Sequence, residues 1–139
     1  MKKNLFIIML MVILGIVTGL SVPTDPPDVI QKVSEAMKIG NASEIAKYLN
    51  PTVELEILGE DNIYSKAQTE LMLKDFFTKN KPKSFKVNHQ GTKGATSFAI
   101  GVLVSESASF RVSIFLKSEK ENLLIHQLRI ENGEEGVIR

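Results

Sequence analysis

The stretch KIGNASEIAKYLNPTVELEI, residues 38–57, decides the fold, because one helix stops in it and another starts at once. Gly40 is the residue type that ends helices in the left-handed conformation. Asn41 follows directly, and Glu44 stands three positions later, which is the spacing of a helix-capping pair. The chain is therefore predicted to turn a corner at Gly40 and to enter a second helix.

The second half of the stretch predicts the end of this helix and the first strand. The helix is expected to present three apolar residues, Ile45, Tyr48 and Leu49. Pro51 disfavours helical geometry at the residue before it, so the helix should stop at Asn50. Beyond it, apolar residues alternate with glutamates as in a half-buried strand, at Val53, Leu55 and Ile57.

A longer helix is predicted upstream. Thr24 or Asp25 can cap it, and prolines stand at its start, where a missing N–H costs nothing. Its apolar residues recur at helical spacing, at Val29, Ile30, Val33, Ala36 and Met37. This helix should end at Gly40.

Downstream, the pattern predicts a turn at 59–62, a short strand at Ile63 and Tyr64, and a third helix. Ser65 and Gln68 form a capping pair for this helix, which should run to about Asn80. Its apolar stripe consists of Met72, Leu73, Phe76 and Phe77.

After Pro82 the period changes to two, which predicts four strands joined by short turns as an antiparallel meander. Alternation assigns one set of residues to the inward face of these strands. The set is Phe85 and Val87, then Phe98, Ile100, Val102 and Val104, then Phe110, Val112, Ile114 and Leu116, then Leu124, His126, Leu128 and Ile130.

The first residues read as an export signal. Lys2 and Lys3 precede an apolar run from Leu5 to Val17, and small residues follow it. We expect a signal peptide over 1–21, with a periplasmic or secreted mature protein, and the alternative is an uncleaved membrane anchor. The remaining divisions are a linker at 22–28, a domain at 29–131 and a flexible tail at 132–139.

Composition excludes several classes of function. The formal net charge is +1, which gives no reason to expect a nucleic-acid partner. The sequence has no cysteine, so disulfides, thiolate nucleophiles and thiolate metal sites are excluded. Two histidines without a spaced carboxylate cluster predict no metal site, and no cofactor is expected.

The order of elements resembles the nuclear-transport-factor-2-like (NTF2-like) superfamily, also described as cystatin-like or ketosteroid-isomerase-like. The residues that carry the resemblance most specifically are GNASEIAKYLNPTVELEI, 40–57. With the signal peptide, the chain resembles a bacterial family of exported domains of unknown function. The resemblance implies an α+β cone in which a strongly curved antiparallel sheet wraps around a long helix, preceded by two N-terminal helices, and encloses a pocket.

Four residues are candidates to line such a pocket, namely Tyr48, Tyr64, Phe76 and His126. Superfamily enzymes use a carboxylate base on the inner face, but alternation places no strand carboxylate there, and Asp75 is expected to be solvated. No catalytic residue is therefore assigned. His126 is the single residue nominated for the alternative of a pocket enzyme.

The strand residues that alternate with the inward set are predicted to form an outward face with two features. Its apolar residues Leu103, Phe115, Leu123 and Ile125 are candidates for a homodimer face. If the first and last strands are neighbours, as in the resembled fold, Glu54 or Glu56 is expected to pair with Arg129.

The function predicted from these observations is that of an exported, non-catalytic binding or interaction module at the cell envelope. Its partner is expected to be a small hydrophobic ligand or an envelope protein, and membrane contact is expected only through an uncleaved signal segment. The alternative is a small-molecule pocket enzyme of isomerase, dehydratase or hydrolase type.

Overall fold

A computed structural model describes residues 25–133, so the predicted signal peptide and residues 134–139 of the predicted tail lie outside the described range. Three helices and six strands make up this range, in an α+β arrangement. Their bounds are α2 Pro26–Ile39, α3 Ala42–Ala46, β1 Leu49–Ile57, β2 Glu60–Ser65, α4 Lys66–Lys79, β3 Pro82–Lys93, β4 Thr96–Ser105, β5 Ser109–Glu119 and β6 Asn122–Asn132.

The six strands form one mixed sheet in the order β2-β1-β6-β5-β4-β3. Strands β3 to β6 are antiparallel neighbours, which confirms the predicted meander. The first and last strands are neighbours, but β1 runs parallel to β6, so the prediction of a wholly antiparallel sheet is wrong. These two strands are far apart in the sequence, so no hairpin fixes their relative direction.

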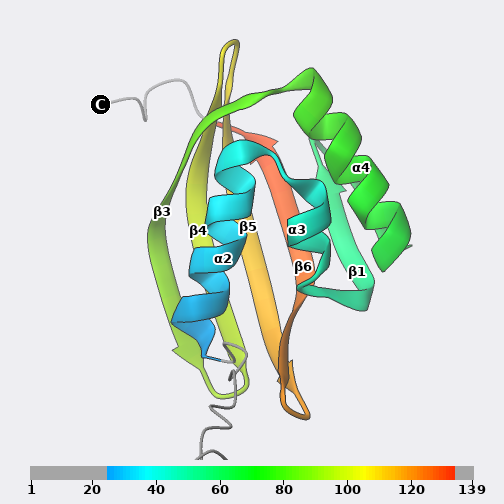
Figure 1. Cartoon of the computed structure of the whole chain (residues 1–139), viewed down its shortest axis with the longest axis vertical. Helices are drawn as coiled ribbons and strands as arrows, with labels where there is room; N and C mark the ends of the chain where they lie inside the picture. The colour runs from blue at the N-terminus through cyan, green and yellow to red at the C-terminus, as the bar shows by residue number, and fades with distance from the viewer. Residues whose placement is uncertain (1–24, 134–139) are drawn as a thin grey trace, which may run out of the picture.

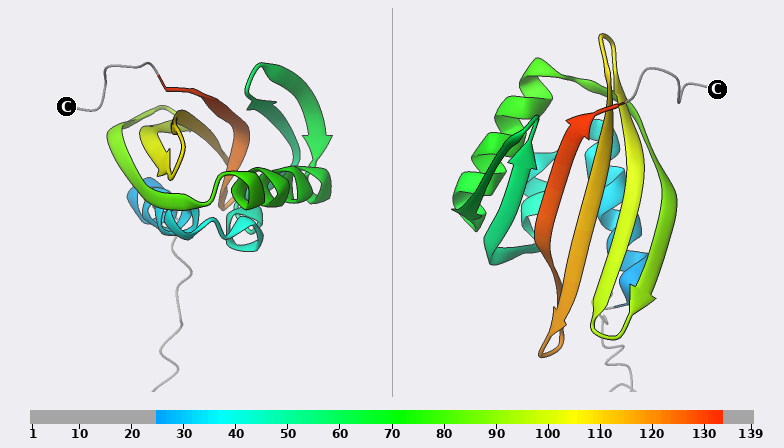
Figure 2. Two further views of the ribbon diagram at one scale, coloured as in Figure 1. Left: turned by 90° about the horizontal axis from the view of Figure 1, so that it is seen from above. Right: turned by 180° about the vertical axis from the view of Figure 1, so that it is seen from behind.

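All three helices lie on one face of the curved, unclosed sheet (Figure 1). Helix α2 packs on β3 and β4, whereas α4 packs on α3 and beside β1. Helices α2 and α4 both have 14 residues, so the structure does not single out one long helix for the sheet to enclose. Seen from behind, the strands lie in front of the helices (Figure 2, right). We call this uncovered side the outer face.

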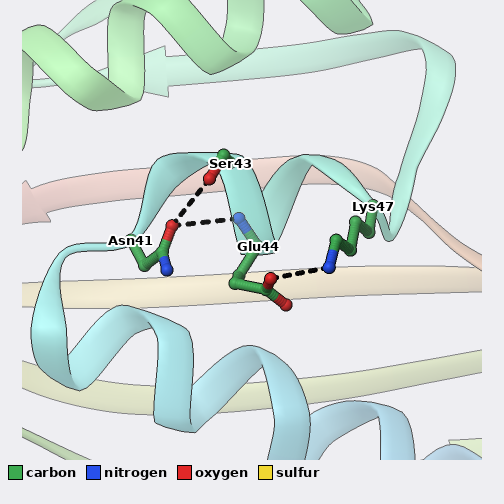
Figure 3. Close-up of polar contacts among 4 residues, drawn as sticks. All are labelled: Asn41, Ser43, Glu44 and Lys47. Atoms are coloured by element: carbon green, nitrogen blue, oxygen red, sulfur yellow. Dashed lines mark hydrogen bonds and ion pairs between the residues drawn. The ribbon is translucent and has the colours of Figure 1, made fainter.

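The corner between α2 and α3 is built as predicted, with one difference (Figure 3). Gly40 has φ 66°, and the Asn41 side chain accepts a hydrogen bond from the Glu44 backbone N–H at 3.2 Å. The Asn41 N–H already donates to the Ala36 carbonyl at 2.8 Å, so the reciprocal half of a capping box has no donor to use. Glu44 pairs with Lys47 at 2.6 Å instead, and this hydrogen bond raises the pKa of Lys47.

Helix α3 is shorter than predicted, because pairing with β6 begins already at Leu49. The N–H of Ile125 donates to the Tyr48 carbonyl at 2.7 Å, and Leu49 is aligned with Ile125 in the β1–β6 pair. Tyr48 therefore lies outside the helix, and Pro51 lies inside β1. At the other end of the domain, α2 begins at Pro26 after the N-cap Asp25, as the prolines at its start predicted.

The third helix, α4, confirms its prediction. Ser65 and Gln68 form a capping box with both halves present, and Asn80 is the C-cap. The turn between β1 and β2 lies earlier than the predicted 59–62, because only Leu58 and Gly59 connect the two strands. Both have positive φ, 51° and 90°, as in the type I′ turns that suit hairpins.

The covered face of the sheet and the helices enclose one hydrophobic core. The predicted inward residues of β5 are all buried there, from Phe110 to Leu116 at alternate positions. The largest fully buried side chains are Met37, Ile45, Leu49, Leu55, Leu73, Leu103, Ile114, Leu116, Ile125, Leu128, Ile130 and Val33.

Strand β4 faces the opposite way from the prediction. The core side of β4 consists of Ser97, Ala99, Gly101, Leu103 and Ser105, whereas Phe98, Ile100, Val102 and Val104 are half-buried on the outer face. A Cβ added to Gly101 would lie 2.8 Å from the Phe85 ring and 2.5 Å from the Lys86 carbonyl oxygen. Because the Phe85 ring and the Lys86 carbonyl fill this space, position 101 has no room for a side chain.

A bulge in β6 changes which of its alternate residues face the core. Leu116 pairs with Ile125 and Phe115 pairs with Gln127, which leaves His126 as the extra residue. The buried residues are therefore Leu123 and Ile125 before the bulge and Leu128 and Ile130 after it. The inward assignment is right beyond the bulge and wrong for Leu124, which is half-buried.

Candidate binding surface on the outer face of the sheet

Three of the four predicted pocket residues lie at or inside the core. The Phe76 ring is buried and packs edge-on against Phe110, with ring centroids 5.1 Å apart. Tyr48 and Tyr64 are half-buried at the margin of the core. The Phe76 ring of α4 and the Phe110 ring of β5 therefore fill part of the interior of the domain.

His126 lies on the β6 bulge, apart from Asp75. Its Nε2 atom is buried without a hydrogen-bond partner, and it lies 3.7 Å from the Glu119 carboxylate. Asp75 is exposed on α4, as predicted, and pairs with Lys79 at 2.9 Å. The arrangement that would favour catalysis, an open pocket in which His126 faces Tyr48 or Asp75, is not supported, because His126 lies beside Glu119 and lines neither of the two hollows described below.

Three of the four predicted dimer-face residues are in the core instead of on the outer face. Leu103 and Ile125 are fully buried, and Leu123 is 8% exposed, for the reasons given for β4 and β6. Phe115 does lie on the outer face, aligned with Phe98 of β4. Homodimerisation stays a prediction, and it now needs a different set of outer-face residues.

One side of the outer face carries the predicted ion pair. Arg129 donates to the Glu56 carboxylate at 2.7 Å, and its guanidinium also lies 3.5 Å from Glu131. The hydrogen bond to Glu56 and the two negative charges raise the pKa of Arg129. The pair joins β1 to β6 across their parallel register.

The other side of the outer face is hollowed. An open hollow of about 700 Å³ extends over β3, β4, β5 and the end of β6. Its floor contains Ile100, Val102 and Val104. With Phe98 these residues form the apolar stripe of β4, which runs for about 20 Å at the usual rise of a strand.

The side chains around this floor include polar, basic and acidic groups. The strands beside β4 contribute Lys86 and His89 from β3 and Arg111 from β5, and Glu131 of β6 closes one end. Reasoning from the sequence missed this surface, because alternation placed the apolar stripe inside the domain. The small residues between its members, Ala99 and Gly101, were the available signal.

A second hollow, of about 530 Å³, lies between α4 and the β1–β2 turn. Phe76 borders it, together with two exposed leucines, Leu58 and Leu71. The Asp75–Lys79 ion pair stands at its rim. Tyr48, Tyr64 and His126 are not among the residues lining either hollow.

Among residues 25–133, no group of three or more histidine, aspartate or glutamate side chains is placed to hold a metal ion. Within the same range, none of the helices has the length and apolar character needed to cross a membrane.

A curved six-stranded sheet with helices on one face defines an α+β domain of NTF2-like fold. The structure is similar to a designed protein named Rd1NTF2_05, with five substitutions, at a TM-score of 0.59 and 10% identity over 75% of this chain and 94% of that one. At that identity the likeness concerns the fold alone.

The amino-acid sequence of this chain is much more similar to the members of one bacterial family than to that designed protein. The family model described as "Domain of unknown function (DUF4783)" matches residues 30–131. A DUF4783 protein from Bacteroides ovatus is 37% identical, with a TM-score of 0.73 over 84% of this chain and 100% of that one. A second, from Bacteroides uniformis, is 36% identical, with a TM-score of 0.73 over 76% and 97%. The chain belongs to the DUF4783 family. No curated protein matches it significantly.

Proposed function

We propose that this protein is an exported, non-catalytic binding module of the bacterial cell envelope, and that it holds a small hydrophobic ligand on the outer face of its sheet. The observation that carries the proposal is the open hollow over the apolar stripe. Its volume lies within the range of about 300–1,000 Å³ that is usual for ligand sites.

The interior of the domain supports a binding role over a catalytic one. Its buried side chains are hydrophobic apart from Thr69, Ser97, Ser105 and Ser113. Acid–base catalysis needs an ionisable group beside the reacting atoms. Among residues 25–133, none of the side chains buried in the core is ionisable.

Export rests on the first residues of the sequence. The order of basic, apolar and small residues over 1–21 is that of a signal peptide. N-terminal sequencing of the protein from a native envelope fraction tests this directly. A start close to residue 22 is expected, and an intact Met1 in the envelope would favour the anchored alternative.

The ligand is tested by native mass spectrometry of protein purified from the envelope. We expect an additional mass on the wild type, which Ile100→Asn removes, because Ile100 forms part of the floor of the hollow. Leu71→Asn is the matched control, because it makes the same kind of change on α4 at a side chain that is 66% exposed.

A neutral fluorescent probe, Nile red, extends the test to protein from which the natural ligand has been removed. The wild type and Leu71→Asn should bind the probe, and Ile100→Asn should bind it at least tenfold more weakly. If the wild type, Ile100→Asn and Leu71→Asn bind Nile red equally, and none of them retains an additional mass, the outer-face site is overturned.

A further inference from the structure

We propose that the hollow selects a ligand with an anionic head, specifically a long-chain carboxylic acid, whose carboxylate lies between Lys86 and Arg111. This inference deepens the proposed function and rests on it. The chain of the acid would lie along the apolar stripe of β4.

The register places the two basic side chains on either side of one apolar residue. Val102 is aligned with Lys86 on β3 and with Arg111 on β5. Residues aligned across a sheet point to the same face, and two strand spacings separate the outer pair by about 10 Å. Both side chains are long enough to turn toward a head group placed over Val102.

Neither basic group is neutralised by a neighbour. Among residues 25–133, no carboxylate lies within ion-pair distance of Lys86 or of Arg111. Glu131 is the cross-strand neighbour of Arg111, but its carboxylate lies 3.5 Å from the Arg129 guanidinium. The two basic groups at the hollow therefore form no ion pair within the described residues, whereas Arg129 on the adjacent part of the face is paired.

Apart from Glu131 at one end of the hollow, the charges beside the stripe have the same sign. Between Ser84 and Lys117, the charged side chains at outward positions of β3, β4 and β5 are all basic. They are Lys86, Lys93, Arg111 and Lys117. A stripe of apolar side chains flanked on both sides by cations matches the chemistry of an amphiphile with a negative head.

Shape and head-group geometry favour a single carboxylic acid over a lipid bilayer. A hollow of about 700 Å³ encloses part of one small molecule, whereas a bilayer needs a protruding apolar surface. Arg111 presents a planar fork of donors, which fits the planar carboxylate in a two-point hydrogen bond. Lys86 then supplies a second charge from the opposite side of the stripe.

The test compares hexadecanoic acid with the primary alcohol of the same chain length, by displacement of Nile red from the full mature protein. The acid should bind at least tenfold more tightly than the alcohol, since a hydrogen bond to a charged group is worth about one order of magnitude in affinity. Arg111→Gln and Lys86→Gln should each weaken the acid about tenfold and leave the alcohol unchanged.

Lys74→Gln is the matched control, because Lys74 is exposed on α4, away from the hollow. It should leave both affinities unchanged. Thermal melts of the three variants should coincide with the wild type, because all three side chains are exposed. Added salt should weaken the acid and spare the alcohol.

Four outcomes separate the two proposals. Equal binding of acid and alcohol, or an acid preference that survives both charge variants, overturns the anion site and leaves the proposed function standing. Binding of neither compound overturns the hydrophobic-ligand function as well. Binding of anionic phospholipid vesicles in place of the free acid overturns the single-molecule ligand proposed here.

Discussion

Replacement of Leu103 by alanine should destabilise the domain much more than replacement of its neighbour Val102. Leu103 is fully buried, and its aligned neighbours across the strands are Phe85 and Phe110. Val102 is half-buried on the outer face, between two exposed basic side chains. Simple alternation from the sequence predicts the opposite order, so this pair of variants distinguishes the two orientations of β4.

The magnitudes follow from burial and from the cavity left behind. A buried Leu→Ala change costs about 2–5 kcal/mol, and the aromatic neighbours of Leu103 belong to paired strands that cannot close the space. We expect about 3 kcal/mol for Leu103→Ala. Val102→Ala removes fewer atoms from a surface that still contacts water, so about 0.5–1 kcal/mol is expected. Both variants should fold, since domains have about 5–15 kcal/mol of stability.

Urea unfolding followed by far-ultraviolet circular dichroism measures both values, because the chain contains no tryptophan to report by fluorescence. Two leucines of α4 set the scale, since Leu73 is fully buried and Leu71 is 66% exposed. Leu103→Ala should match Leu73→Ala, and Val102→Ala should match Leu71→Ala. An equal or larger loss for Val102→Ala would refute the orientation of β4 and remove the floor of the hollow.

Three further predictions concern the packing of β3 on β4, the β1–β2 turn and the outer face. Gly101→Ala should cost about 2 kcal/mol or more of stability, because the added Cβ would lie 2.5 Å from a backbone oxygen. Gly91→Ala should cost less, because its Cβ would meet only the Phe98 ring, which can move. Thermal melts that reverse this order would contradict the packing. Leu58→Asn should stabilise the domain by about 1 kcal/mol in urea titrations, because Leu58 has φ 51° and asparagine tolerates this left-handed conformation better than leucine. A loss of stability would contradict backbone strain at Leu58. Phe115→Ser should weaken the predicted homodimer in sedimentation equilibrium, and an unchanged dissociation constant would exclude this side chain from the interface.

The candidate site was only partly predictable from the sequence. The Glu56–Arg129 pair was anticipated because the resembled fold places the first and last strands side by side, and the register then aligns the two residues. The hollow was not anticipated. Its floor consists of β-branched residues that alternation by itself assigns to the core, since a pattern of period two identifies two faces without saying which one the helices cover.

Local signals determined the end of α2 and the start of α4. Gly40 in the left-handed conformation and the Ser65–Gln68 capping box act through backbone groups only a few residues away, so the sequence alone specifies these boundaries. The strand period, too, is a property of the sequence. It predicted four strands after Pro82, and all four are present.

Tertiary structure decided which way the strands face. The Phe85 ring covers Gly101 only because β3 pairs with β4, and the extra residue at His126 is defined only by the register between β5 and β6. Both interactions join residues that are distant along the chain. A one-residue shift moves every side chain of a strand to the other face, so these two contacts assign the apolar stripe of β4 to the surface and Ile125 to the core.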